Sequence, residues 1–181
     1  HDHDTNIRFT RQMVQLAETF TADVEAELGC IQGEEDGLDF GGRSEKMTDP
    51  ASAVDFVEKT HPAALAVCIG NVHGRYTRPP RLDFDRLAAI EKCVAVPLVL
   101  HGTSGLPEEM ILQAIRLGIC KFNVNTEIRL AYVDQLATLF QDNGRPELVA
   151  IMNQGIDAMK DPVKEKIRLF GAVNKAAHHL N

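Results

Sequence analysis

Apolar residues along the chain are grouped in two ways, as short runs and as longer stretches with helical spacing. Short runs bounded by turn residues predict strands, and the most continuous of them predict strands buried on both faces. The predicted strands cover residues 23–28, 64–69, 96–100 and 119–124. Helical spacing predicts helices over residues 7–19, 50–60, 84–92, 107–117 and 127–140 and over most of 146–177. This alternation of strands and helices predicts a parallel sheet covered by helices.

Capping and turn residues mark the limits of several predicted elements. Asp49 precedes Pro50, a combination typical of a helix N-cap followed by the first helical position. Gly118 ends one predicted helix and Thr126 can cap the next. The polar, glycine-rich stretch 29–49 predicts a long loop, and 75–81 predicts a basic loop.

Two α/β architectures fit this order of elements: a doubly wound open sheet and a (β/α)8 barrel. Only four strands are predicted in the 181 residues. A complete barrel has eight strands and typically about 250 residues. The pattern alone therefore predicts half of a barrel or a small open sheet, with residues 1–181 forming a single domain.

Composition and charge exclude several classes of protein. A hydrophobic fraction of 44% with 25% charged residues is ordinary for a globular domain. The net charge of −7 argues against a nucleic-acid partner, and no apolar run approaches the roughly 18 residues of a membrane span. The four cysteines form no CxxC pair, so we expect buried, reduced thiols in a cytoplasmic protein. They are Cys30, Cys68, Cys93 and Cys120.

Polar residues follow each predicted strand at its carboxyl end. His73 and His101 occupy equivalent places after two successive strands, each followed by a glycine. Because these strand ends form the active-site face of parallel α/β folds, the two imidazoles could share one Zn²⁺. On the first predicted strand, Glu25 and Glu27 point to the same side, because side chains alternate along a strand.

Two further segments suit phosphate, and one acidic loop suits proton transfer. Residues 102–105 and 123–126 each lead into a helix N-terminus, where free N–H groups favour an anion. Ordinary turn and capping chemistry would explain the same residues. The acidic tip 33–37 is either solvated surface or a mobile loop that brings a carboxylate over a site.

Five motifs together resemble the class II fructose- and tagatose-bisphosphate aldolases. They are VEAELGCIQGEEDG, AVCIGNVHGRY, VPLVLHGTSGLP, LGICKFNVNTE and KEKIRLFGA, in this order, and the likeness extends over about residues 6–175. The resemblance implies a (β/α)8 TIM barrel, of which this chain holds only the last four strands and their helices. It also implies reversible, zinc-dependent aldol cleavage of a ketose bisphosphate into dihydroxyacetone phosphate and glyceraldehyde 3-phosphate.

The resemblance also assigns roles to individual residues. His73 and His101 match zinc ligands, Glu27 matches a ligand of a second metal position, and Glu35 matches a catalytic loop acid. Matches to the phosphate and ketone site are Gly74, Gly102, Thr103, Ser104, Asn123, Val124, Asn125 and Thr126. A monovalent cation, Na⁺ or K⁺, accompanies that site in many members, and members are commonly dimers or tetramers.

The chain departs from the family pattern at its beginning. The family's third zinc histidine lies in a motif resembling HLDH, and His1-Asp2-His3-Asp4 is similar to it in letters. Counting back from the Glu25 strand places residues 1–5 instead in a loop before the first helix. We therefore expect the first four strands and one metal ligand to be absent, and little turnover by this chain alone.

Three functions remain open at this point. The chain is a catalytic part of a metal aldolase, a non-catalytic remnant or interaction module that retains the metal and phosphate site, or a phosphate-binding α/β domain of other chemistry. Fructose and tagatose bisphosphates are not distinguished, because that choice belongs to the aldehyde half of the site.

Overall fold

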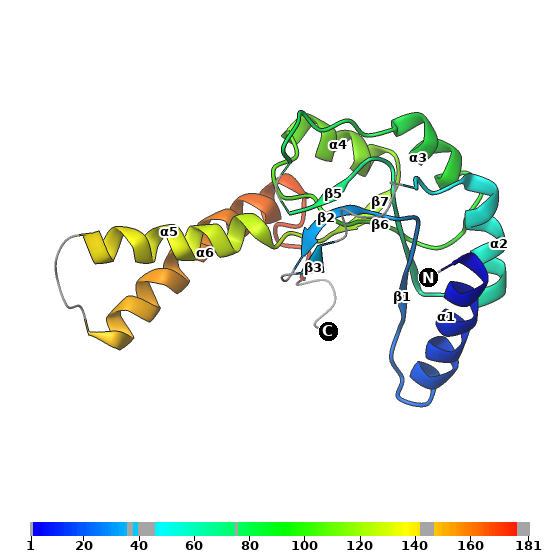
Figure 1. Cartoon of the computed structure of the whole chain (residues 1–181), viewed down its shortest axis with the longest axis horizontal. Coiled ribbons are helices and arrows are strands. Elements are labelled where there is room, and N and C mark those ends of the chain that lie inside the picture. The colour runs from blue at the N-terminus through cyan, green and yellow to red at the C-terminus, as the bar shows by residue number, and fades with distance from the viewer. Residues whose placement is uncertain (1, 36–37, 40–45, 75, 142–146, 177–181) are drawn as a thin grey trace. The chain divides into compact units, whose positions relative to one another are not determined.

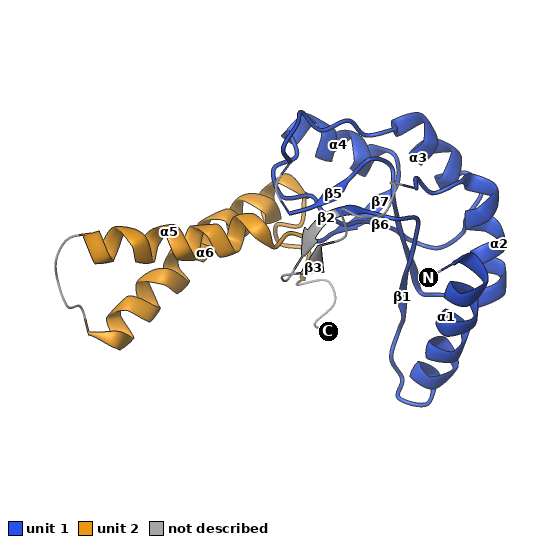
Figure 2. Cartoon of the chain, viewed as in Figure 1, with its two compact units in different colours: residues 1–123 blue, residues 124–181 orange. Residues whose placement is uncertain are grey.

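A computed structural model describes residues 2–35, 38–39, 46–74, 76–141 and 147–176, excluding the side chains at 33–35 and 38–39. The chain divides into two compact units, residues 1–123 and 124–181 (Figure 2). The first unit holds a parallel sheet with its helices, and the second a pair of helices. The expected single domain 1–181 thus remains a prediction.

Four parallel strands form the main sheet of the first unit. They are β1 (Glu25–Leu28), β4 (Ala64–Val67), β6 (Leu98–Leu100) and β7 (Ile119–Phe122). Their order in the sheet, β1-β4-β6-β7, follows their order in the chain. A doubly wound sheet would reverse direction at a switch point. The strand order of this sheet does not reverse, so it is the order found in the wall of a (β/α)8 barrel.

Four helices accompany these strands and follow one another along the outside of the sheet (Figure 1). They are α1 (His3–Glu18), α2 (Pro50–Thr60), α3 (Phe84–Glu91) and α4 (Glu108–Arg116). Aspartates at the N-caps of the first three accept hydrogen bonds from the first turn, as Asp49 does from the Ser52 amide at 2.9 Å.

The two faces of the sheet differ in character. The helix-covered face carries buried aliphatic residues and forms the core. They include Leu28, Leu65, Val67, Leu98 and Leu100. The opposite face carries Glu27, Ala66, Val99 and Lys121, which are paired in register across the four strands. On this second face, the long polar side chains of Glu27 and Lys121 therefore lie beside the small, buried side chains of Ala66 and Val99.

The region predicted as a long loop contains short strands instead. Gln32–Glu35 (β2) pairs antiparallel with Leu38–Asp39 (β3) and parallel with Val72–His73 (β5). The prediction failed because the sequences QGEE and LD contain no apolar run, which is the signal that predicts a buried strand. The pairing with β2 gives the backbone of His73 a strand conformation.

The first helix begins at His3, four residues earlier than predicted, so the placing of residues 3–5 in a loop was wrong. Asp2 is its N-cap and accepts from the Thr5 amide at 2.8 Å. His3 contacts Asp55 of α2 at 3.2 Å. Among the described residues, His3 and Asp4 are outside the candidate metal cluster described below.

The cysteine prediction was partly wrong. All four thiols are free, but only Cys68 is buried, whereas Cys93 and Cys120 are exposed. Cys120 lies on edge strand β7, at a register irregularity between that strand and β6. An edge strand has a neighbour on one side only, so an apolar sequence does not ensure burial there.

The second unit consists of α5 (Thr126–Gln141) and α6 (Leu148–Leu169), which pack against each other. Gly155 of α6 makes this close approach possible, because a Cβ there would lie 2.4 Å from the Tyr132 ring. In the part of the chain that the structure describes, no helix combines the length and apolarity required to cross a membrane.

Candidate metal centre

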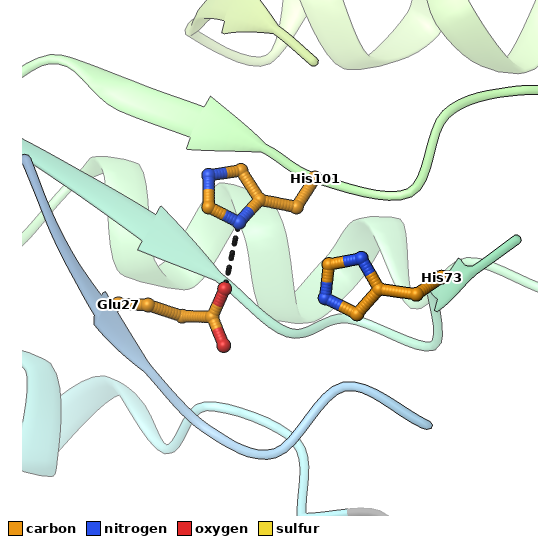
Figure 3. A group of neighbouring side chains, drawn as sticks. All are labelled: Glu27, His73 and His101. Atoms are coloured by element: carbon orange, nitrogen blue, oxygen red, sulfur yellow. Dashed lines mark hydrogen bonds and ion pairs between the residues drawn. The ribbon is translucent and has the colours of Figure 1, made fainter. Parts of the chain in front are cut away.

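Three side chains meet at the carboxyl ends of the strands of the main sheet. Glu27, His73 and His101 offer ligand atoms that all lie within 4.8 Å of one another. Figure 3 shows both imidazoles and the carboxylate directed toward a common space. The two histidines and Glu27 thus lie together, and their roles as metal ligands remain a prediction.

The sheet register explains why side chains from distant parts of the sequence meet here. Glu27 pairs with Ala66 on β4, and Ala66 pairs with Val99 on β6. Paired residues of a parallel sheet share a face, and His101 follows Val99 by two positions. Glu27 and His101 therefore project from the same face, with the small side chain of Ala66 between their strands.

His101 is held by a carboxylate at each ring nitrogen. Its Nδ1 lies 2.7 Å from Glu27 Oε2, and its Nε2 lies 2.9 Å from Glu25 Oε1. The second oxygen of Glu25 accepts from Lys121 Nζ at 2.6 Å. The imidazole side chain is 17% exposed, so these contacts are partly shielded from water.

The charges of this cluster shift two pKa values. The pKa of His101 is raised, chiefly by the hydrogen bond with Glu27, against an opposing effect of burial and with help from Glu25. Burial would raise the pKa of Glu25, but the hydrogen bonds from Lys121 and His101 outweigh it and lower the pKa. In the metal-free chain, the geometry therefore favours an imidazolium between two carboxylates.

Backbone contacts tie together the two loops that carry the histidines. The fully buried Asn71 accepts from the Ile69 amide at 2.9 Å and donates to the His101 carbonyl at 3.0 Å. The Tyr76 hydroxyl donates to the Gly102 carbonyl at 2.9 Å and accepts from the Val72 amide at 3.3 Å. Burial raises the pKa of Tyr76 to about 12, so this hydroxyl keeps its proton at neutral pH.

The donor set fits a zinc ion. Zinc in enzymes is bound by imidazole nitrogens and carboxylate oxygens, with one position left open. Tetrahedral ligands at zinc bond lengths are separated by about 3.4 Å. The candidate ligand atoms lie within 4.8 Å of one another, which is near that spacing. For Nδ1 of His101 to become a ligand, it must release its proton.

The predicted substrate residues of the first unit lie near this cluster along the chain. Gly74 and Gly102 follow the two histidines and have positive φ angles of 79° and 62°. Thr103 is fully buried and donates to the Asn123 carbonyl at 2.8 Å. Ser104 is buried as well, next to Thr103 in the chain. Their predicted contact with substrate remains a prediction.

The remaining predicted site residues belong to the second unit or to strand β2. Val124, Asn125 and Thr126 belong to the second unit, where Thr126 is the first residue of α5 and not the cap before it. The Asn125 carbonyl accepts from the Ile128 and Arg129 amides, each at 3.1 Å. Glu35 is the last residue of β2, and its side chain lies outside the described residues.

Sequence reasoning missed four residues that shape the cluster: Glu25, Asn71, Tyr76 and Lys121. Glu25 was placed on the correct face but was given no role. Alternation could have placed Lys121 on one face of its strand, but not beside Glu25, because two other strands separate them in the sheet. No local pattern marked Asn71 or Tyr76, whose partners are backbone atoms of another loop.

The fold and the side-chain cluster define part of a barrel protein with a candidate metal centre. A sequence model of the family described as fructose-bisphosphate aldolase class-II matches residues 1–175. The chain belongs to this class II aldolase family. The barrel expectation is confirmed, because the four-stranded sheet corresponds to a part of the family's barrel structures.

Individual relatives show the extent of the match. A 6-phospho-5-dehydro-2-deoxy-D-gluconate aldolase from Bacillus velezensis is 41% identical over 177 residues, which are 97% of this chain and 60% of the relative. The crystal structure of the YdjI aldolase from Escherichia coli K12 has a TM-score of 0.81 at 37% identity, with 97% of this chain and 60% of that chain covered.

A third relative, assigned as a fructose-1,6-bisphosphate aldolase, comes from Coccidioides immitis. Its structure has a TM-score of 0.87 at 30% identity, with 98% of this chain and 62% of that chain covered. This chain thus spans about 60% of the length of the relatives that it matches.

Proposed function

We propose that this chain supplies the metal-binding and phosphate-binding side of a class II aldolase site that reversibly cleaves a ketose bisphosphate. The substrate is fructose 1,6-bisphosphate or tagatose 1,6-bisphosphate, with dihydroxyacetone phosphate as the ketone product. The observation that carries the proposal is the meeting of Glu27, His73 and His101 at the carboxyl ends of the strands. In barrel enzymes this end carries the active site.

The metal proposed for this cluster is Zn²⁺, held by His73 and His101 with Glu27 at a neighbouring position. When bound, it would supply Lewis acidity that polarises the carbonyl oxygen of the ketone fragment. Glu35 is the proposed acid and base that moves a proton at the ketone's carbon. Its backbone continues the strand that pairs with β5, the strand of His73.

The substrates named for two of the relatives share one half of their structure, the ketone phosphate. In fructose 1,6-bisphosphate, the ketone carbon is next to a carbon that carries phosphate. The name 6-phospho-5-dehydro-2-deoxy-D-gluconate describes the same pair, with a ketone at carbon 5 and phosphate on carbon 6. Aldol cleavage of either compound releases the same three-carbon ketone phosphate. A site for this shared fragment is therefore the part of the function that the proposal supports best.

The residues proposed to hold that fragment are the glycines and hydroxyls that follow the strands. They are Gly74, Gly102, Thr103, Ser104, Asn123, Val124, Asn125 and Thr126, with Na⁺ or K⁺ as an accompanying cation. Backbone N–H groups at Gly-rich turns and helix N-termini bind phosphate oxygens without a basic side chain. This explains how an acidic chain can take an anionic substrate. A cytoplasmic location and a homo-oligomeric state complete the proposal.

Reconstitution tests the function directly. The chain is co-expressed with the part of the Bacillus velezensis relative that it does not match, and cleavage of the two ketose bisphosphates and of 6-phospho-5-dehydro-2-deoxy-D-gluconate is measured. We expect cleavage that EDTA abolishes and Zn²⁺ restores. We also expect His73→Ala and His101→Ala to lower kcat/KM at least 100-fold, because each removes a ligand.

Two outcomes would contradict the proposal. A folded, reconstituted barrel that cleaves none of the three substrates favours the non-catalytic alternative. Cleavage that persists in EDTA, or in His73→Ala, contradicts the role of the metal cluster. The chain by itself is expected to show little turnover, because it spans only about 60% of the length of the relatives that it matches.

A further inference from the structure

The polar face of the sheet carries an ion pair that joins its two edge strands. Glu25 lies on β1 and Lys121 on β7, and their charged atoms are 2.6 Å apart. The strands between them carry Ala64, Ala66 and Val99 on this face. Small side chains at these positions leave space for the two long ones to reach across.

Glu25 also contacts His101, but through its other oxygen. Oε1 lies 2.9 Å from His101 Nε2, while Oε2 is occupied by Lys121. The opposite ring nitrogen, Nδ1, faces Glu27, which belongs to the candidate metal cluster. Among the described residues, that cluster comprises Glu27, His73 and His101 and does not include Glu25.

In this geometry the two ring nitrogens of His101 have different partners: Nδ1 faces the candidate metal cluster, and Nε2 faces Glu25. A neutral imidazole has one N–H donor and one acceptor, and the partner of the donor determines which nitrogen is free to bind a metal. A carboxylate that accepts from one ring nitrogen commonly fixes the orientation of a metal-binding histidine in this way. Glu25 stands on the side away from the cluster, where such a partner is needed.

Building on the proposed function, we propose that Glu25 is a positioning residue for the metal centre and that Lys121 holds it in place. Glu25 accepts the Nε2–H of His101 and so directs Nδ1 to the metal. Lys121 occupies the second oxygen of the carboxylate and thereby fixes its orientation. The edge strands β1 and β7 are thus coupled to one ligand of the metal.

The experiment measures zinc binding by the 181-residue chain in competition with a chromogenic chelator. Glu25→Ala is expected to weaken zinc affinity by about 10- to 100-fold, the usual effect of losing such a partner. Glu58→Ala, at an exposed position of α2, is the matched control and should leave the affinity unchanged. Circular dichroism of each variant verifies that the fold is retained.

Glu25→Gln tests the part played by Lys121. A glutamine can accept from Nε2–H only by turning its amide NH₂ group toward the Lys121 ammonium, which places two donors face to face. Turned the other way, it presents donors to Nε2 and favours the wrong tautomer. We expect Glu25→Gln to bind zinc weakly, and Glu25→Gln combined with Lys121→Met to recover most of the lost affinity.

A spectroscopic measurement separates positioning from general structural support. In the zinc-loaded chain, ¹⁵N chemical shifts of His101 should show a protonated Nε2 and a metal-bound Nδ1. Zinc on Nε2, or unchanged affinity in Glu25→Ala, would overturn the inference and leave the proposed function standing. A wild-type chain that fails to bind zinc would overturn both.

Discussion

His101 is the residue on which the chemistry of the candidate centre depends most. Its two ring nitrogens contact the carboxylates of Glu27 and Glu25 at 2.7 and 2.9 Å. An imidazole between two carboxylates is stabilised in its charged form. In the proposed metal centre, Glu27 would be a ligand and Glu25 an orienting partner once a cation displaces the proton on Nδ1.

The raised pKa of His101 predicts a pH dependence in the metal-free chain. Because the folded state holds the proton more tightly than the unfolded state, the stabilisation is complete below the ordinary pKa near 6.5 and is lost as pH rises through the folded pKa. NMR titration of the His101 ring should give a pKa above 6.5. Glu27→Gln should lower it, because the Glu27 hydrogen bond is the largest cause of the shift.

Glu58→Gln serves as the control for that titration and should not move it. A His101 titration at or below the ordinary value in the wild-type chain would show that the ion pairs are too solvated to matter. Zinc affinity measured over the same range should rise with pH, since binding at Nδ1 releases a proton.

At the scale of elements, the centre depends on how closely two loops approach each other. Gly102, after β6, lies against the Val72 carbonyl of β5, and Asn71 and Tyr76 bridge the same two loops. These contacts fix the spacing between His73 and His101. Neither histidine is buried in the apolar core, so these loop contacts help to position both of them, in addition to the carboxylates that contact the His101 ring.

Gly102→Ala is predicted to destabilise the first unit. The new Cβ would lie 2.1 Å from the Val72 oxygen, in a backbone with a φ of +62°. Gly105→Ala is the matched control, because its φ is +86° but the nearest atom lies 3.9 Å away. Both carry the strain of a positive φ, while the first adds a steric clash that typically costs about 1–3 kcal/mol.

Urea denaturation followed by circular dichroism measures this difference. We expect the free energy of unfolding to fall about 2 kcal/mol further in Gly102→Ala than in Gly105→Ala. Equal losses would mean that the loops move apart without cost, and the centre would then be less preorganised than its contacts indicate.

At the scale of the whole molecule, two helices expose large apolar side chains. Helix α6 presents a stripe of exposed side chains at helical spacing, namely Val149, Met152, Ile156, Val163 and Ile167. Helix α1 presents Phe9, Met13 and Leu16 in the same way. Extended exposed apolar surfaces of this kind mark contacts with other chains, which agrees with the proposed homo-oligomer.

The role of the α6 stripe in self-association can be tested by introducing charged side chains into it. Met152→Lys combined with Ile156→Lys should reduce self-association in sedimentation equilibrium, because two charges would have to be buried at the contact. Asn153→Lys combined with Gln154→Lys adds the same charge at exposed polar positions of the same helix and should leave association unchanged. Similar behaviour of the two double variants would exclude this stripe as the contact.

The four-stranded sheet and its helices could be read from the sequence because apolar runs and helical spacing persist over enough residues to be recognised. Strands β2, β3 and β5 could not, since their short sequences QGEE, LD and VH contain no apolar run. The beginning of α1 was also missed, because its first turn is polar and only the Asp2 cap marks it.

The sequence by itself determined the parallel α/β class and the order of the elements. It also determined that two histidines follow successive strands, because burial and alternation act on neighbouring residues. Only the tertiary structure decided which side chains meet across the sheet. Glu25 reaches Lys121 and His101 over two strands of small residues, and Asn71 holds a carbonyl of another loop. Contacts between residues 30 to 96 positions apart depend on register and curvature, and no local pattern records them.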